Sequence, residues 1–83
     1  MFLKIYDFTE TEIAEFYLNA MHNVRDIRKQ KGVSQLDLAY LIGHKSVSTI
    51  AKIESGQENK HYNLEHLYKI AKVLDVDICD LIK

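Results

Sequence analysis

The sequence predicts an all-α fold of five helices, and three observations indicate it. None of its 83 residues is a proline, so no helix interior is interrupted by a residue without a backbone N–H. Apolar residues recur at three- and four-residue intervals along most of the chain. Each such run follows a residue that can cap a helix, and there are five of them: Thr9, Ser34, Ser46, Asn63 and Asp77.

Size and composition indicate one small domain. The hydrophobic fraction of 47% and the charged fraction of 28% are typical of soluble globular proteins. The single cysteine, Cys79, cannot form an internal disulfide, so we expect a reducing, cytoplasmic location. The N-terminal apolar segment is too short for a signal peptide and is interrupted by a charged residue. No apolar run in the sequence is long enough to span a membrane.

The first eight residues, MFLKIYDF, predict a short strand or an ordered arm, because they are rich in β-formers and contain no helix cap. Apolar side chains alternate onto both faces of this segment, and a lone strand with two apolar faces needs a partner. The partner is either the same segment of a second subunit or the chain's own helices.

A long helix follows. Thr9 and Glu12 have the spacing of a capping box. Apolar residues then recur without a break as far as Ile27, and Gly32 can end the helix. We therefore expect one helix from about Glu10 to Lys31.

The first part of that helix belongs to an acidic extension, residues 1–21. Two series of apolar residues with a seven-residue spacing indicate the seam of paired helices, and they comprise Ile13, Ala20 and Ile27 together with Tyr17 and Val24. The extension is therefore expected to contact a second subunit or another partner. The alternative is that this stripe packs on the core of its own chain.

Two short helices come next, around a tight turn. Ser34 is expected to cap a helix from Gln35 to Ile42, and Gly43 is expected to end it. Its buried side is expected to comprise Leu36, Ala39, Leu41 and Ile42.

The second short helix is expected from Val47 to Ser55. Ser46 is its expected cap, and Gly56 is expected to close it. Ile50 and Ile53 would face the core.

Two further helices complete the prediction. Asn63 can cap the first of them, with an inward side made of Leu64, Leu67, Ile70, Ala71 and Leu74. Asp77 can cap a final short helix, in which we expect Cys79 to be a small core or interface residue.

The charge distribution is more informative than the net charge of −1. Residues 1–21 hold one lysine against four acidic residues, whereas residues 22–62 hold seven lysines and arginines against four acidic residues. The positive excess coincides with the two short helices. Local potential, rather than total charge, steers a protein to phosphate groups, so this region is a candidate for nucleic-acid binding.

The sequence gives little support for an enzyme. It has no glycine-rich phosphate loop and no nucleophile elbow, so we expect no catalytic residues and no cofactor. Four histidines lack the spacing of metal ligands, so no metal site is expected at His22, His44, His61 or His66.

Several residues of the two short helices carry a resemblance to a known family: Gln35, Ala39, Gly43, the run Ser48 to Ile50, Ile53, Glu54 and Gly56. In these positions the stretch resembles the helix-turn-helix of the phage-repressor and Cro family, also called the XRE type. The resemblance extends from about Val24 to Leu81, and the link after Gly43 is one residue longer than in the commonest version. It implies a five-helix repressor-like helix-turn-helix domain over residues 22–83, preceded by the extension.

The resemblance also implies roles for individual residues. Arg28 and Glu54 are expected to form a structural ion pair. In this motif the N-terminal residues of the second helix contact base edges, which here are Val47, Ser48, Thr49 and Lys52. The expected contacts to the DNA backbone are Ser34, Gln35, Lys45, Ser46, Asn59, Lys60 and His61.

The expected function is sequence-specific binding of double-stranded DNA by a transcriptional regulator. A repressor that binds a palindromic operator as a homodimer is the simplest form, because one such domain contacts few base pairs. The alternative is an antitoxin-like or other protein-binding regulator that uses its acidic N-terminal segment to hold a partner.

Overall fold

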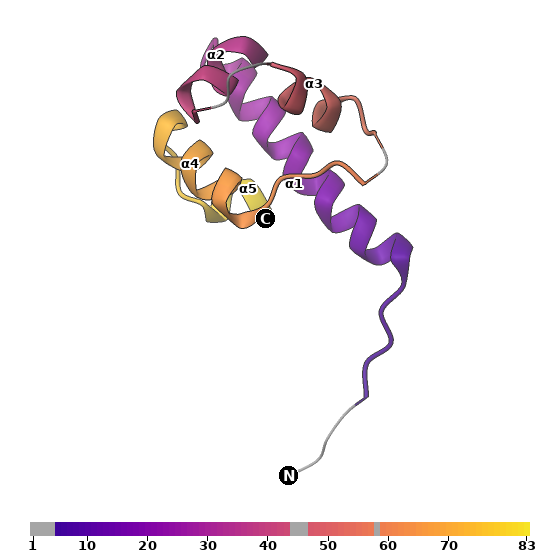
Figure 1. Ribbon diagram of the computed structural model, residues 1–83. Helices are drawn as coiled ribbons and strands as arrows, with labels where there is room; N and C mark the ends of the chain where they lie inside the picture. Colours follow the sequence, from indigo (N-terminus) through magenta and orange to yellow (C-terminus); the bar gives the residue numbers. More distant parts are fainter. Residues whose placement is uncertain (1–4, 44–46, 58) are drawn as a thin grey trace.

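The computed structural model describes residues 5–43, 47–57 and 59–83. These residues form helices and no strand, so the all-α prediction is confirmed (Figure 1). The helices, in chain order, are α1 (Glu10–Gln30), α2 (Gln35–Leu41), α3 (Ser48–Glu54), α4 (Leu64–Leu74) and α5 (Cys79–Ile82).

Helix α1 is a single unbroken helix of 21 residues that joins the extension to the rest of the domain. It starts with the expected capping box, in which the Glu12 amide donates to Thr9 Oγ1 at 3.0 Å and the Thr9 amide to Glu12 Oε2 at 3.4 Å. Its last turn carries Arg28 and Lys29, whose charges suit the negative end of the helix dipole. Gly32 follows with a φ of 70°, a backbone conformation that favours glycine.

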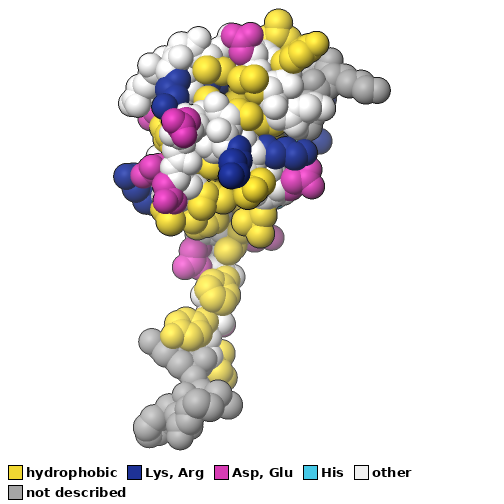
Figure 2. Space-filling view, turned by 90° about the vertical axis from the view of Figure 1, so that its left-hand side faces the viewer, with side chains coloured by type: hydrophobic (Ala, Val, Ile, Leu, Met, Phe, Trp, Pro, Cys, Tyr) yellow, Lys and Arg dark blue, Asp and Glu magenta, His cyan; other side chains and the backbone are white. Residues whose placement is uncertain are grey.

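Of the two forms predicted for the N-terminal segment, a short strand or an arm, the described part shows an arm and no strand. Residues 5–9 form an arm that continues away from the body at the N-terminal end of α1 (Figure 1). Ile5 is 90% exposed and Phe8 is 70% exposed, and Figure 2 shows apolar side chains along the projecting arm. The described chain offers no second strand, so the backbone of the arm has no neighbouring strand with which to form hydrogen bonds. Residues 1–4 lie outside the described residues.

Tertiary packing divides α1 into two parts. Ala20, Met21 and Val24 are buried, whereas Ile13 and Phe16 are 45% and 55% exposed. The interpretation in which the whole apolar stripe packs on its own core is therefore wrong for the first two turns.

The core lies where the C-terminal two thirds of α1 meets the other four helices. Its largest fully buried side chains come from all five helices and comprise Val24, Leu38, Ile50, Ile70, Leu74 and Leu81.

Two helices show an inward face that differs from the prediction. In α2, Leu36 and Leu41 are 59% and 53% exposed, and Leu38, which was not predicted, is fully buried beside Ala39. The reason is geometric, since residues 38, 39 and 42 share one side of a helix and positions 36 and 41 flank it. At the start of α4, Leu64 is 81% exposed although it was expected to face inward.

Helix α5 packs on α1 and is held there by asparagine side chains. Asn23 Nδ2 donates to the carbonyls of Leu81 and Lys83 at 3.1 and 3.0 Å, and Asn19 Nδ2 donates to the Lys83 carbonyl at 2.8 Å. The C-terminus of the chain therefore lies beside the middle of α1.

The start of α5 differs from the prediction in one respect. Ile78 occupies the cap position, and Asp77 Oδ1 accepts a hydrogen bond from the Cys79 amide at 2.9 Å. Cys79 is exposed, so of its two expected places, the core or an interface, the core is wrong and the interface stays a prediction. Hydrogen bonding with the Asp77 carboxylate and its negative charge raise the pKa of the Cys79 thiol.

None of the helices in the described ranges is both long and apolar enough to cross a membrane. In those same ranges no three histidine, cysteine or acidic side chains gather in a way that could hold a metal ion.

Candidate nucleic-acid interface

Helices α2 and α3 form the predicted pair, and local contacts fix the start of α2. The Asp37 amide donates to Ser34 Oγ at 3.0 Å, and the Ser34 amide donates to the Asp37 carboxylate at 3.5 Å. After α2 the chain turns at Gly43, which has a φ of 89°. The described chain resumes at Val47, and three residues, His44, Lys45 and Ser46, lie outside the described residues.

Helix α3 presents one buried and one exposed side. Ile50 and Ile53 are 0% and 3% exposed, and they anchor the helix to the core. Ser48 and Lys52 are exposed, and they lie one turn apart on the opposite side. Val47 and Thr49 are half-buried at the edges of that side. Val47 takes the cap position where Ser46 was expected, and it makes no side-chain capping bond.

The C-terminal end of α3 is clamped by its last residue. The Glu54 carboxylate accepts hydrogen bonds from Arg28 Nε at 2.9 Å and Arg28 Nη2 at 2.7 Å. A third donor is Gln35 Nε2, at 3.1 Å from Glu54 Oε1. One carboxylate therefore ties α3 to α1 and to the first residue of α2.

This clamp lies inside the protein. The side chains of Arg28 and Glu54 are only 7% and 4% exposed, and Arg28 Nη1 donates in addition to the Val33 carbonyl at 2.8 Å. Two parallel charge-assisted hydrogen bonds of this kind fix both distance and orientation. The structure thus brings together Arg28 and Glu54, the expected structural pair, and adds Gln35 to them.

Tyr62 is buried near the clamp. Burial, and after it the negative charge of Glu54, raise the pKa of the Tyr62 phenol. Its hydroxyl has no hydrogen-bond partner among the described residues, which is a rare condition for a buried polar atom.

The loop after α3 carries the remaining candidate contacts. Asn59 adopts a φ of 63°, which asparagine tolerates better than most residues, and the Lys60 amide donates to the Gln57 carbonyl at 3.1 Å. Asn59, Lys60 and His61 are all exposed.

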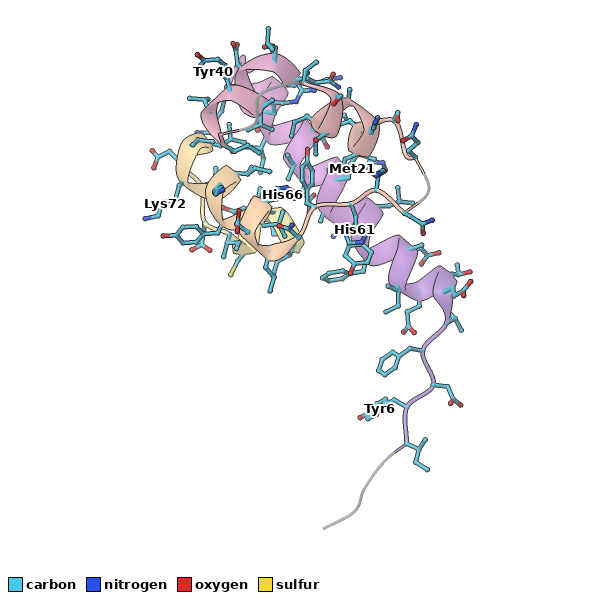
Figure 3. All side chains as sticks on the ribbon, in the orientation of Figure 1. Tyr6, Met21, Tyr40, His61, His66 and Lys72 are labelled. Atoms are coloured by element: carbon cyan, nitrogen blue, oxygen red, sulfur yellow. The ribbon has the colours of Figure 1, made fainter. Side chains whose placement is uncertain are left out.

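His61 has a neighbour that the sequence did not predict. Its ring stacks on Tyr17 of α1 with a centroid distance of 3.7 Å and an interplanar angle of 12°. Figure 3 shows His61 lying against α1. The loop that carries the expected phosphate contacts therefore packs on the extension.

Tyr40 is another surface residue that the prediction passed over. It is 80% exposed on α2, next to the expected interface, and Figure 3 shows it on the outer side of that helix. The sequence offered little indication that Tyr40 is exposed, because a tyrosine among leucines on a short helix is also compatible with burial.

Comparisons with known proteins agree with this arrangement. A family model described as helix-turn-helix matches residues 24–81. Among solved structures, the chain is similar to the restriction-modification controller protein C.AhdI from Aeromonas hydrophila, known from a high-resolution crystal structure, with 32% sequence identity and a TM-score of 0.67. The alignment covers 82% of this chain and 97% of that one. The comparison with curated proteins gives no match.

Proposed function

The chain belongs to the XRE-type helix-turn-helix family of DNA-binding transcription regulators, and from this premise we propose that it is a repressor that binds a palindromic operator as a homodimer. One observation carries the proposal: α3 exposes Ser48 and Lys52 on one side while its other side and its end are held rigidly by the core and by Glu54. A rigid support of this kind is what base recognition requires, since base-edge contacts depend on hydrogen-bond geometry.

The proposed base contacts are Val47, Ser48, Thr49 and Lys52. A lysine donates to O6 and N7 of guanine, a hydroxyl pairs with several bases, and a valine methyl group packs against the thymine methyl group. Ser48 and Lys52 are the most exposed of the four, so they are expected to contribute most to specificity.

The proposed contacts to the DNA backbone flank this helix. Ser34 and Gln35 lie at the start of α2, and Asn59, Lys60 and His61 lie in the loop after α3. Lys45 and Ser46, from the turn, complete the set. The hydrogen bond from Gln35 Nε2 to Glu54 supports a fixed position for the Gln35 amide at the edge of the interface.

The domain of residues 22–83 would bind DNA, and residues 1–21 would contribute to the dimer. Two copies acting on half-sites about 34 Å apart would read enough base pairs for a specific site. The similarity to a restriction-modification controller protein supports a regulatory role, which this chain would perform in the cytoplasm.

In vitro selection of bound DNA tests the proposal directly, because the selected site reports both its sequence and its symmetry. We expect an inverted repeat. Selection of an asymmetric site, or of no preferred sequence at low salt, would contradict the palindromic operator.

Substitution of two lysines separates the proposed roles. Lys52→Ala is expected to weaken binding to the selected site by about 1–3 kcal/mol and to relax the preference at one base position. Lys60→Ala is expected to weaken binding to all sequences alike. It should also reduce the slope of the logarithm of the binding constant against the logarithm of the salt concentration by about the contribution of one phosphate contact. Lys72→Ala, on the exposed side of α4, is the matched control and should change neither quantity. An unchanged sequence preference for the Lys52 variant would contradict its base contact.

A further inference from the structure

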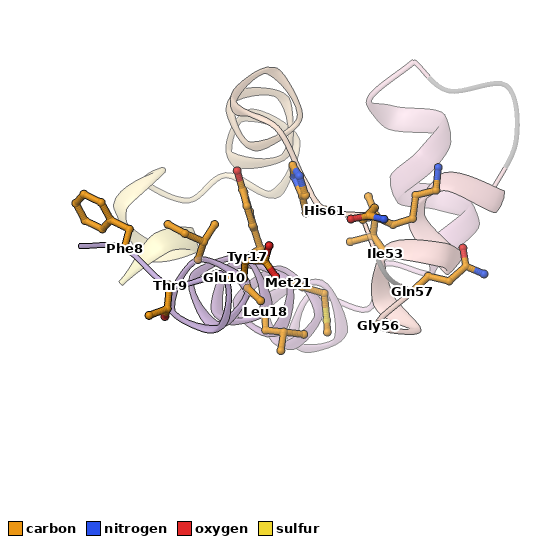
Figure 4. Close-up of a pocket in the computed structure, with 14 residues that line it drawn as sticks. Phe8, Thr9, Glu10, Tyr17, Leu18, Met21, Ile53, Gly56, Gln57 and His61 are labelled. Carbon is orange, nitrogen blue, oxygen red and sulfur yellow. The ribbon is translucent and has the colours of Figure 1, made fainter. Parts of the chain in front are cut away.

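The stack of His61 on Tyr17 joins the loop after α3 to the extension, and its two rings overlap almost completely. The ring centroids are 3.7 Å apart and the ring planes differ by 12°. Because carbon atoms in contact are about 3.5–4.0 Å apart, this centroid distance leaves almost no lateral offset. Figure 4 shows the two side chains side by side above α1. Tyr17 is half-buried and His61 is exposed, so the His61 ring keeps access to solvent.

This geometry suits a charged imidazole ring. Two neutral aromatic rings prefer an offset or an edge-to-face arrangement, because the faces of both rings carry partial negative charge. A cation above the face of a tyrosine is instead attracted by the quadrupole of the ring. The observed overlap is therefore the arrangement expected for a protonated His61 on a neutral Tyr17.

The hydrogen bond of the His61 ring indicates which nitrogen carries a proton. Nδ1 lies 3.3 Å from the carbonyl oxygen of Tyr62, and a carbonyl only accepts, so Nδ1 is the donor. In a neutral ring Nε2 would then carry no proton and would be an acceptor. Phosphate oxygens are acceptors as well. His61 can therefore donate to a phosphate through Nε2 only when its ring is protonated.

The surroundings of the ring contain charges of both signs. The ionisable residues that line the two hollows bordered by the stack are Glu10, Tyr17, Lys60, Tyr62 and Glu65. The two carboxylates attract a charged ring, and the lysine repels it. Within the described ranges no carboxylate forms an ion pair with His61, so no internal anion competes with a phosphate for the ring.

The stack supports the loop between two anchored ends. The Gln57 amide donates to the Lys52 carbonyl at 3.3 Å, which ties the start of the loop to α3. Tyr62 is 3% exposed and fixes the end of the loop in the core. Between these anchors, the Tyr17 ring supports the exposed His61 from the side of α1. The position of the His61 ring therefore depends on a residue of the extension.

We infer that Tyr17 is a positioning residue for DNA binding, which holds His61 so that its protonated ring donates to a backbone phosphate. Binding of DNA then takes up a proton at His61. The inference deepens the proposed function, on which it rests, because His61 is one of the proposed contacts to the DNA backbone. Since the bound state holds the proton, affinity for DNA rises as the pH falls through the range in which histidine titrates, and it is lost as the pH rises.

Binding of the full chain to its selected site, measured by fluorescence anisotropy at pH 6 and pH 8 and at constant ionic strength, tests the inference. The wild-type chain is expected to bind about three- to tenfold more tightly at pH 6 for each bound subunit, because histidine gains most of its charge between these values. His61→Gln keeps a polar side chain that cannot gain a charge, so it should remove this difference.

The other histidines provide matched controls. His22→Gln, His44→Gln and His66→Gln are each expected to retain the wild-type difference between pH 6 and pH 8. Glutamine suits the capping-box position that His66 occupies after Asn63. His44 precedes α3 in the sequence and lies outside the described residues, so its variant separates its contribution from that of His61. A difference that persists in His61→Gln and disappears in one of the controls would overturn the inference.

Substitutions of Tyr17 test its positioning role. Tyr17→Phe keeps a stacked ring and is expected to retain the wild-type difference. Tyr17→Leu removes the ring and should abolish most of the difference while the helical circular dichroism is retained. Tyr68→Leu, which removes an aromatic residue that is 59% exposed on α4, is the control for loss of a surface ring. A Tyr17→Leu chain with the wild-type difference, or a Tyr17→Phe chain without it, would overturn the role of Tyr17.

Calorimetry provides an independent readout, because binding enthalpies measured in two buffers of different ionisation enthalpy count the protons taken up. At pH 7 we expect proton uptake by the wild-type chain and none by His61→Gln. A wild-type chain that binds its selected site equally well at pH 6 and pH 8, without proton uptake, would overturn the inference and leave the proposed function intact. A chain that binds no DNA at either pH would contradict the proposed function, and the inference with it.

Discussion

Replacement of Glu54 by glutamine is the most direct test of the clamp beneath α3, the helix proposed to contact base edges. The substitution keeps the size of the side chain and removes its charge. Arg28 would then be left as a charge without a partner at a site where its side chain is 7% exposed. Glutamine would also present an amide N–H₂ group to at least one of the three donors that now point to the carboxylate.

The expected cost follows from this burial. Removal of one partner of a buried ion pair typically costs about 3–5 kcal/mol, because the remaining charge stays desolvated. Domains have a total stability of about 0.05–0.15 kcal/mol per residue, so a chain of 83 residues has roughly 4–12 kcal/mol in all. A loss of about 3 kcal/mol would lower the melting temperature by roughly 12–24 °C.

Urea unfolding followed by circular dichroism measures the loss. The matched control is Glu65→Gln, which breaks the pair between Glu65 and Lys69 at 2.8 Å on the surface of α4, where the two side chains are 73% and 44% exposed. An exposed helix pair of this kind is worth about 0.3–0.5 kcal/mol. If the Glu54 variant loses no more stability than the Glu65 variant, the argument that burial makes this clamp costly to break is wrong.

Three further outcomes are expected. Tyr62→Phe removes a buried hydroxyl that has no partner among the described residues, so it should raise the free energy of unfolding by about 1 kcal/mol; a comparable loss in urea unfolding would mean that the hydroxyl is hydrogen-bonded. Asn23→Ala removes two hydrogen bonds that hold the C-terminal residues on α1 and should cost about 2 kcal/mol, whereas Asn19→Ala removes one and should cost about half as much. Asp77→Asn weakens the hydrogen bond and removes the negative charge that together raise the pKa of the Cys79 thiol, so at pH 8 the thiolate fraction should increase and alkylation by iodoacetamide should become faster; an unchanged rate would contradict this coupling.

The extension contacts the candidate nucleic-acid interface. Tyr17 lies in the extension and stacks on His61, which belongs to the loop that would contact the DNA backbone. Lys60 of the same loop lines a hollow beside the N-terminal half of α1. The loop therefore packs on the extension, whose contribution to a dimer is part of the proposed function.

The sequence by itself determined where most helices begin and which residues α3 exposes. The starts of α1, α2 and α4 depend on contacts between residues three positions apart, as in the pairs of Thr9 with Glu12 and Ser34 with Asp37. The exposed side of α3 follows from helical periodicity once Ile50 and Ile53 are inward. Such local relations are written directly in the order of the residues.

The tertiary structure alone decided which apolar residues are buried and which distant side chains meet. Leu38, rather than Leu36 or Leu41, is the leucine of α2 that is buried in the core. Several faces of this seven-residue helix are similarly apolar, and the neighbouring helices decide which one is covered. Tyr17 meets His61 and Gln35 meets Glu54 across long stretches of chain. Contacts of this kind depend on how helices pack in space, and the spacing of residues along the chain does not specify them.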